Sequence, residues 1–497
     1  MIHPTTHTAP TTTAPTNLLT VVRELPADLD TPVSVYLRLL GHGPSFLLES
    51  VTGGEQIARY SFIGVNPSEI FVLRGHTLET HTAVGDVTVR SLPENVNPQD
   101  ALRDELAKHR PAQIPGLPRF FGGLVGFLGY EAVRFFEPSV GLTAHHTLPD
   151  AIFLHADTLV AFDHAFGRLL IIANVPVNGD EAKARAVAEA EIAAIEERLK
   201  APLTNIPTAE DSPPAPTLHA NMTQEEFMGA VEVAKEHIAA GDIFQVVLSQ
   251  RFHRETTAPP FSIYRTLRRL NPSPYMFFFD FDTILGEEPF YLIGASPEVH
   301  VRLEDGTASL RPIAGTRPRG ATPAEDTALE EDLLADPKEL AEHVMLVDLA
   351  RNDLGRVCEY GSVHVPEQMV VERYSHVMHI VSHTEGQLRP DYDAFDLMKA
   401  TFPAGTVSGA PKIRAMQIIN DLENGPRGAY AGAVGYYSYD GSMDTCIAIR
   451  TLTMQGQTVS VQAGAGIVAD SDPAAEYQET LNKARALAVA VEKAEQA

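Results

Sequence analysis

MTQEEFMGAVEVAKEHIAAGDIFQVVLSQRF, residues 222–252, contains a helix start, a helix end and a strand in one continuous run. Thr223 followed by acidic residues in the next turn is typical of a helix N-terminus, and Gly241 is typical of a helix end. The apolar, β-branched run from Gln245 onwards predicts a strand. We take residue 222 as the start of a structural unit.

Strands and long helices follow one another beyond this stretch without the regular rhythm of a parallel sheet. Alternating patterns predict strands at 290–293, 299–303, 434–439 and 458–463. Strand and helix do not take turns as βαβ units require, so we predict an α+β fold.

The N-terminal side of the chain has a different composition. Residues 18 to about 177 combine short β-branched and aromatic runs with Gly and Pro, which predicts mostly strand. An Ala/Glu-rich helix is predicted at 180–200, and a Pro-rich linker follows it. We therefore divide the chain into a disordered tail (1–17), an N-terminal half (18–178), a helix and linker (179–221) and a second unit (222–490).

Composition limits the classes of partner. The chain has 497 residues, 44% of them hydrophobic, and a net charge of −27, which disfavours nucleic acid and anionic membranes. Two cysteines exclude a disulfide framework and a Cys-rich zinc site, so any metal should prefer oxygen ligands. No secretion signal and no apolar run of about 20 residues is visible, which predicts a cytoplasmic protein.

Two predicted helix starts have the same construction. Each is an Asp-Pro pair followed by two Glu residues three positions apart: Asp336-Pro337 with Glu339 and Glu342, and Asp472-Pro473 with Glu476 and Glu479. For either helix alone, ordinary N-terminal preferences explain this pattern well. Four carboxylates together would suit a hard cation that prefers oxygen and water ligands, so the pair of helices predicts Mg²⁺.

A glycine cluster, Gly464-Ala465-Gly466, follows the predicted strand at 458–463. It partly matches a dinucleotide fingerprint, but no βαβ unit fits the single helix that remains. Backbone N–H groups here would suit a small carboxylate, and a plain strand-end turn is equally consistent. The Gly-rich loops at 311–320 and 403–414 lack the ending of a phosphate loop, so nucleotide binding is not predicted.

Arg450 and His379 are further candidates with ordinary alternatives. Arg450 ends the predicted strand CIAIR (446–450), where a salt bridge is commoner than a clamp for a substrate carboxylate. His379 lies in SHVMHIVSH (375–383), where a hydrogen-bonded core histidine is the commoner case. Neither residue assigns an activity by itself.

Seven motifs occur in a fixed order: GASPE (294–298), RPIAGTRPRG (311–320), DPKELAEHVMLVDLARNDLG (336–355), PAGTVSGAPK (403–412), GAYAGAVGY (428–436), DTCIAIRT (444–451) and GAGIVADSDP (464–473). With them the chain resembles the chorismate-utilising enzymes. LLES (47–50), RYSFIG (59–64) and GGLVGFLGYE (122–131) extend the resemblance through the N-terminal half. The family implies a two-part α+β fold of large, mostly antiparallel sheets, with the active site in the cleft between them.

The resemblance also implies how chorismate is held. Its ring carboxylate would bind Mg²⁺, and its enolpyruvyl carboxylate would be held by basic and hydroxyl groups. The implied metal ligands are Glu339, Glu342, Glu476 and Glu479, and the implied substrate contacts are Gly315, Thr316, Tyr430, Arg450, Lys483 and the backbone of Gly464, Ala465 and Gly466.

Two positions separate the branches of this family. Water-using relatives carry a Lys base where this chain has Gln245, and a neutral amide cannot activate water. Relatives that make a 4-amino product carry a Lys nucleophile where this chain has Ala314. The resemblance therefore implies that ammonia attacks C2, giving anthranilate and pyruvate. Glu298 would protonate the departing 4-hydroxyl, and His379 and Thr406 match positions implicated in the second step.

LLES and NPSPYM (271–276) resemble a tryptophan feedback site. Its implied contacts are Glu49, Ser50, Pro274, Tyr275 and Met276. Without the resemblance, a strand end and a Pro-rich turn would explain these residues. We expect tryptophan to inhibit by favouring a closed-off state of the catalytic cleft.

The source of ammonia is expected to be another polypeptide. No segment resembles a glutamine amidotransferase, and neither Cys358 nor Cys446 follows a nucleophile-turn pattern. The family implies a partner amidotransferase subunit, usually in a heterotetramer. Two alternatives remain. One is an aminodeoxychorismate-forming subunit, disfavoured by Ala314. The other is a non-catalytic tryptophan sensor, disfavoured by the full set of charged residues.

Overall fold

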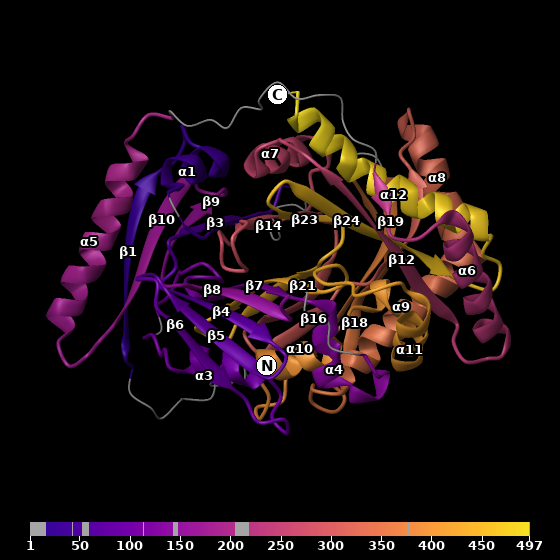
Figure 1. The fold of residues 1–497 in the computed structure, drawn as a ribbon, viewed down its shortest axis with the longest axis horizontal. Coiled ribbons are helices and arrows are strands. Elements are labelled where there is room, and N and C mark those ends of the chain that lie inside the picture. The colour runs from indigo at the N-terminus through magenta and orange to yellow at the C-terminus, as the bar shows by residue number, and fades with distance from the viewer. Residues whose placement is uncertain are drawn as a thin grey trace, which may run out of the picture.

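Two large antiparallel sheets form the centre of the structure, and helices cover their outer faces (Figure 1). The computed structural model describes residues 16–41, 43–51, 59–112, 114–142, 148–203, 218–374 and 377–496. Most of the predicted tail and residues 204–217 of the predicted linker lie outside these ranges. The predicted α+β class of large antiparallel sheets is confirmed.

The first sheet has twelve strands among the described residues. Its order is β1 (Leu18–Pro26), β10 (Arg168–Pro176), β9 (Thr158–Asp163), β3 (Tyr60–Val65), β2 (Ser45–Glu49), β13 (Tyr275–Asp280), β14 (Phe290–Ser296), β23 (Thr451–Gln455), β24 (Thr458–Ile467), β12 (Gln245–Glu255) and β11 (His219–Ala220), with β20 (Gly409–Ala410) also paired to β12.

The second sheet also has twelve described strands. Its order is β17 (Ile313–Pro318), β19 (Val377–Gln387), β16 (Thr307–Leu310), β15 (Val299–Glu304), β22 (Met443–Ile447), β21 (Ala433–Ser438), β7 (Gly123–Leu128), β8 (Ala151–Ala156), β4 (Glu69–Arg74), β5 (Thr77–Thr82) and β6 (Val87–Ser91), with β18 (His364–Arg373) also paired to β19.

Strands from before the predicted linker and strands from after it form separate groups within each sheet. In both sheets the strands that precede residue 179 form one end, and those that follow residue 218 form the other. The two ends join where β2 pairs with β13 and where β7 pairs with β21. The predicted boundaries stay a prediction, but each half contributes to both sheets.

Aromatic and aliphatic side chains fill the space between the sheets. Along β13, Phe277 and Phe279 belong to this central core, whereas Met276 and Phe278 pack on the other face of the strand. This alternation is what a strand buried on both faces requires. Gly294 is paired with Phe277, and a Cβ at Gly294 would lie 2.0 Å from the Phe277 ring. The close approach of this ring therefore requires glycine.

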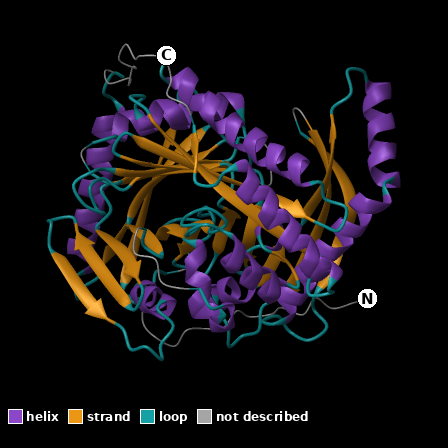
Figure 2. Ribbon diagram, turned by 45° about the vertical axis from the view of Figure 1, so that its right-hand side comes forward, coloured by secondary structure: helices purple, strands orange, loops and turns teal. Residues whose placement is uncertain are grey.

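Helices surround the strands (Figure 2). On the outer face of the first sheet and around it lie α1 (Pro32–Leu39), α5 (Glu181–Leu199), α6 (Gln224–Ala239), α7 (Pro260–Leu270) and α12 (Pro473–Ala494), and α11 (Lys412–Leu422) packs on β12 and β20. With the second sheet lie α8 (Pro323–Ala335), α9 (Pro337–Gly355) and α10 (Ala394–Thr401), and α3 (Gln99–Ala107) and α4 (Val133–Phe136) contact α10. Short 3₁₀ helices occur at η1 (Tyr130–Ala132), η2 (Pro138–Val140) and η3 (Gly405–Val407).

Local sequence signals agree with these elements. Thr223 caps α6 in a capping box with Glu226, as the opening stretch predicts. The strands predicted at 290–293, 299–303, 434–439 and 458–463 correspond to β14, β15, β21 and β24. None of the helices in the described ranges is long and apolar enough to cross a membrane.

Candidate active site

The two Asp-Pro motifs start α9 and α12, and both are capped as the sequence predicts. The Asp336 carboxylate accepts hydrogen bonds from the backbone N–H groups of Lys338 (3.0 Å) and Glu339 (3.4 Å). Asp472 accepts one from the N–H of Ala475 (2.8 Å). N-capping therefore explains the Asp-Pro part of both motifs and leaves the Glu side chains available for another role.

The Glu side chains lie near one another within each helix start. Burial and the neighbouring Glu342 raise the pKa of Glu339, and burial and the neighbouring Glu479 raise the pKa of Glu476. Lys338, at the start of α9, acts in the opposite direction on Glu476 in α12, so the two helix starts are close. This concentration of negative charge and oxygen atoms suits a hard cation.

The described part of the chain does not contain a complete metal-binding sphere. No three of its His, Cys, Asp and Glu side chains are grouped closely enough to hold an ion. The side-chain amide of Gln245 donates to Glu342 at 2.8 Å, and Lys483 pairs with Glu479 at 2.6 Å. A cation here would need water and substrate oxygens besides the carboxylates, as Mg²⁺ commonly does.

The glycine cluster lies within a strand rather than in a turn after it. β24 continues to Ile467 and pairs with β12 along its whole length, whereas β23 pairs only with its first part, up to Val461. One edge of the glycine segment therefore has no strand partner among the described residues, and its N–H groups on that edge can receive an anion.

Two side chains approach the backbone of this segment closely. A Cβ at Gly464 would lie 2.6 Å from the hydroxyl of Tyr430, and one at Gly466 would lie 2.8 Å from the amide nitrogen of Gln245. The Lys483 ammonium donates to the Gly464 carbonyl at 2.9 Å. The structure therefore brings Tyr430 and Lys483 to the predicted glycine segment.

Arg450 lies between β22 and β23, where the chain passes from one sheet to the other. Its φ is +50°, a left-handed conformation that costs a non-glycine residue of order 1 kcal/mol. Among the described residues, no carboxylate lies within ion-pairing distance of Arg450, and burial lowers the pKa of its guanidinium. The commoner alternative of a salt bridge does not apply, and a strained, unpaired arginine suits the binding of an anion.

Glu298 lies in the short connection between β14 and β15. Burial raises the pKa of its carboxyl to about 7, while a hydrogen bond from Thr406 and the charges of Arg450 and Lys483 act in the opposite direction. The N–H of Ile447 donates to the Glu298 carbonyl at 3.1 Å and holds the connection on β22. Glu298 is therefore partly protonated near neutral pH and lies close to three predicted site residues.

His379, on β19, contacts the predicted Gly315-Thr316 segment. Its Nδ1 lies 3.0 Å from the Gly315 carbonyl and 3.0 Å from the Thr316 hydroxyl, and burial lowers the pKa of the ring. A β-bulge between Ala314 and Thr316 places Gly315 at φ +73°, which favours glycine. A Cβ there would lie 3.2 Å from Glu339, so this segment also borders the carboxylate pairs.

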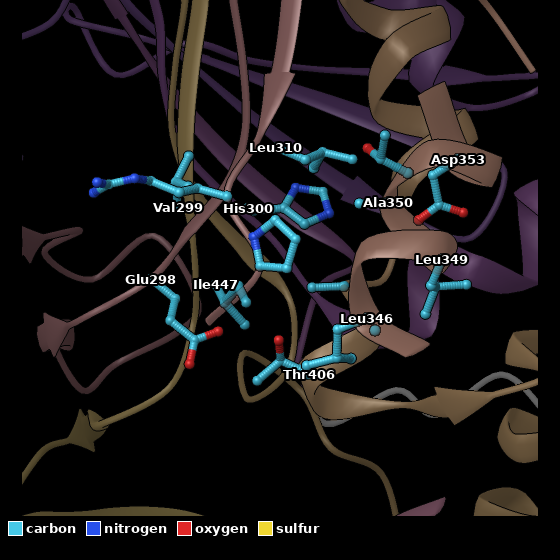
Figure 3. Close-up of a pocket in the computed structure, with 15 residues that line it drawn as sticks. Glu298, Val299, His300, Leu310, Leu346, Leu349, Ala350, Asp353, Thr406 and Ile447 are labelled. Carbon is cyan, nitrogen blue, oxygen red and sulfur yellow. The ribbon is translucent and has the colours of Figure 1, made fainter. Parts of the chain in front are cut away.

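A cavity lies beside Glu298 (Figure 3). Glu298 and Thr406 face each other across one end of it, and Leu346, Leu349 and Ala350 of α9 line the opposite side. None of the predicted substrate contacts lines this cavity. Glu298 therefore borders this space and also feels the charges of Arg450 and Lys483.

A second cavity is lined by every predicted tryptophan contact. Glu49, Ser50, Pro274, Tyr275 and Met276 all line it. The cavity lies where β2 meets β13, so both halves of the chain form its walls.

The wall of the second cavity includes charged residues that sequence reasoning missed. Arg302 binds Asp444 at 2.9 Å, and the Tyr275 hydroxyl donates to the same carboxylate at 2.9 Å. Arg119 lies 3.8 Å from Asp444. These residues are far apart in the sequence, and the pairing of β15 with β22 brings Arg302 and Asp444 together.

The fold is a scaffold in which two antiparallel sheets bring basic, acidic and glycine-rich elements together. A family model described as "chorismate binding enzyme" matches residues 43–489. This chain belongs to the family of chorismate-binding enzymes.

Relatives match the chain over almost its full length. Anthranilate synthase component 1 of Acinetobacter calcoaceticus is 46% identical and that of Aquifex aeolicus 48% identical, each over 97% of this chain and 96% of the relative. The crystal structure of anthranilate synthase component I from Streptococcus pneumoniae covers 93% of this chain and 98% of its own, with a TM-score of 0.76 and 38% identity. The menaquinone-specific isochorismate synthase of Escherichia coli shares the fold, with a TM-score of 0.72, 20% identity and coverage of 96% and 95%.

Proposed function

We propose that this chain is the chorismate-using component of an anthranilate synthase, a lyase of tryptophan biosynthesis that forms anthranilate and pyruvate from chorismate and ammonia. The observation that carries the proposal is a Glu298 carboxyl with a pKa of about 7 close to Thr406, Arg450 and Lys483. The full-length similarity to proteins with this name supports it.

Glu298 acts as the general acid of the first step. Because its pKa is about 7, a substantial fraction is protonated at neutral pH. It donates its proton to the 4-hydroxyl, the C4–O bond breaks, water leaves and ammonia adds at C2. Gln245, which donates to Glu342, is neutral and cannot activate water in competition with ammonia.

His379 serves the second step. Burial keeps its imidazole neutral, and the contact of Nδ1 with the Gly315 carbonyl assigns the ring proton to that nitrogen. Nε2 then accepts the proton from C2, the C3–O bond breaks, and enolpyruvate leaves and is protonated to pyruvate. Thr406 holds the Glu298 carboxylate through its hydrogen bond.

Glu339, Glu342, Glu476 and Glu479 are the residues that would hold Mg²⁺. Bound there, the ion would hold the ring carboxylate of chorismate and offset the repulsion that raises the pKa values of Glu339 and Glu476. Arg450, Lys483, Tyr430 and the free edge of the glycine segment would receive the enolpyruvyl carboxylate.

Ammonia comes from a partner amidotransferase in this proposal. Both cysteines are buried, and burial raises the pKa of Cys358 to about 11, which makes it a poor nucleophile. We propose a heterotetramer of two chains of each kind in the cytoplasm. Tryptophan is proposed to occupy the second cavity as a feedback inhibitor, because that cavity brings together all five residues of the feedback motifs.

The proposal is tested by turnover of chorismate with Mg²⁺ and ammonium salt at high pH. Formation of anthranilate is followed by its fluorescence, and mass spectrometry identifies both products. The expected products are anthranilate and pyruvate, and tryptophan should lower the rate at which they form. A 4-amino product, isochorismate or the absence of turnover would contradict it, and binding of tryptophan without turnover would indicate a sensor.

A further inference from the structure

Strands β15 and β22 form a wall shared by the two cavities. β15 contributes Val299 and His300 to the cavity beside Glu298 and Arg302 to the second cavity. β22 contributes Ile447 to the first and Asp444 to the second. The two strands are paired antiparallel, with Arg302 opposite Asp444. A shift of these two paired strands at one cavity therefore also moves residues that line the other cavity.

Asp444 connects the paired strands β15 and β22 to Tyr275 of the feedback motif, which lies on β13. Its buried carboxylate accepts a hydrogen bond from the Tyr275 hydroxyl at 2.9 Å and pairs with Arg302 at 2.9 Å. Arg302 also donates to the Tyr275 hydroxyl at 3.1 Å, which closes a triangle of contacts. Charge-assisted hydrogen bonds of this kind are stronger than neutral ones and hold three strands together.

Glu298 and Arg450 are hydrogen-bonded to the other end of the paired strands β15 and β22, or lie next to it in the chain. Ile447 donates its N–H to the Glu298 carbonyl at 3.1 Å and accepts a hydrogen bond from the Ser296 hydroxyl at 2.7 Å. Arg450 follows three residues later, and its carbonyl accepts from Ala295 at 3.1 Å. Figure 3 shows Val299, His300 and Ile447 beside Glu298. At about 3.3 Å per residue, Asp444 lies roughly 10 Å along the strand from Ile447.

We propose that Asp444 couples occupancy of the second cavity to the position of Glu298 and Arg450. The inference rests on the proposed tryptophan site and specifies how that site acts. A ligand packed against Tyr275 changes the position of its hydroxyl, Asp444 follows it, and β22 moves relative to β15. Asp444 is thus a positioning residue that links two sites by contacts both can change.

The test measures tryptophan binding with and without chorismate, in the absence of ammonia. The chain contains no tryptophan, so the fluorescence anisotropy of the ligand reports binding without a protein background. Because coupling is reciprocal, chorismate should weaken tryptophan binding in the wild type. In Asp444→Asn and in Tyr275→Phe, the ratio of the Kd with chorismate to the Kd without it should fall to near one.

Asp440→Asn is the matched control, since Asp440 lies in the turn before β22 and contacts only that turn. It should behave as the wild type. An unchanged Kd ratio in both test variants would overturn the inference. So would parallel loss of binding in both variants, because Asp444 would then be only a ligand contact. No tryptophan binding by the wild type would overturn the proposed site itself, which is a distinguishable result.

Discussion

At the scale of single residues, Glu298 is the group on which the first step of the proposed mechanism depends. Replacing it with Gln removes the proton but keeps the shape, and we expect kcat to fall about 10²- to 10⁴-fold, the usual contribution of a general acid. Steady-state rates with saturating chorismate measure the effect. Turnover that stays near the wild-type level would exclude Glu298 as the acid.

The pH dependence gives a second test of the same group. Burial raises the pKa of Glu298 to about 7. In the proposed mechanism the protonated form is the active one. Rates expressed per concentration of free ammonia should therefore be constant below about pH 6 and fall tenfold per pH unit well above pH 7. Glu298→Gln should lose this descending limb, and a limb that persists in the variant belongs to another group.

Ser50 tests the proposed feedback cavity. Replacing it with Phe adds a ring to the wall of this cavity and should exclude tryptophan. We expect at least tenfold more tryptophan to be needed for half-inhibition, each variant being compared with its own uninhibited rate. Ser34→Phe is a control, because Ser34 lies in α1 and does not line the cavity. Unaltered inhibition in Ser50→Phe would place tryptophan elsewhere.

Single residues also show how far the sequence could predict the site. The resemblance identified Glu298, Arg450 and Lys483. In the structure, the charges of Arg450 and Lys483 act on the Glu298 carboxyl. Arg302 and Asp444 were missed because their meaning depends on the pairing of β15 with β22, which no local pattern encodes.

At the scale of elements, α9 and α12 were predicted well because caps are local signals. Asp336 and Asp472 bind the first N–H groups of their own helices. The glycine cluster was harder, since Gly commonly marks a turn, yet β24 continues through it. Contacts from Tyr430 and Gln245, distant in sequence, explain the glycines, so local reasoning could identify the segment but not its conformation.

Gly464→Ala tests whether substrate binding requires the close approach of Tyr430 to β24. The added Cβ would lie 2.6 Å from the Tyr430 hydroxyl and 2.9 Å from the Leu248 carbonyl, so the strand or Tyr430 must shift. We expect KM for chorismate to rise about tenfold, equivalent to about 1.4 kcal/mol of binding. Gly229→Ala, in α6 with no atom near its Cβ, is the control and should raise stability by about 0.5–1 kcal/mol. An unchanged KM in Gly464→Ala would separate this strand from substrate binding.

The starts of α9 and α12 carry the prediction for Mg²⁺. Chelation should abolish turnover and added Mg²⁺ should restore it. Glu342→Gln and Glu479→Gln should each raise the Mg²⁺ concentration for half-maximal rate at least tenfold, because each removes one of few protein ligands. Glu232→Gln on the exposed face of α6 is the control. A rate that is insensitive to chelation would contradict the metal site.

At the scale of the whole molecule, the order of the strands was beyond sequence reasoning. β2 pairs with β13 although more than two hundred residues separate them, and β7 pairs with β21 across a longer interval. Hydrophobic alternation predicts that such strands exist, but not which edges meet. The resemblance supplied the two-sheet fold, and the structure shows that each half forms one end of both sheets.

This arrangement predicts that the C-terminal half depends on the N-terminal half for its folding. A fragment of residues 222–497 would expose the edges of β13 and β21, which carry five and six residue pairs with β2 and β7 in the full chain. It would also uncover the apolar face that includes Phe277 and Phe279. Exposed apolar edges promote aggregation, so the fragment alone should be insoluble or lack a cooperative unfolding transition. Co-expression with residues 1–221 should restore solubility, because β2 and β7 again cover both edges. A soluble, monomeric fragment that unfolds cooperatively would instead show that the C-terminal half is an independent domain. The cavity between β2 and β13 would then lie at an interface between two domains that can come apart.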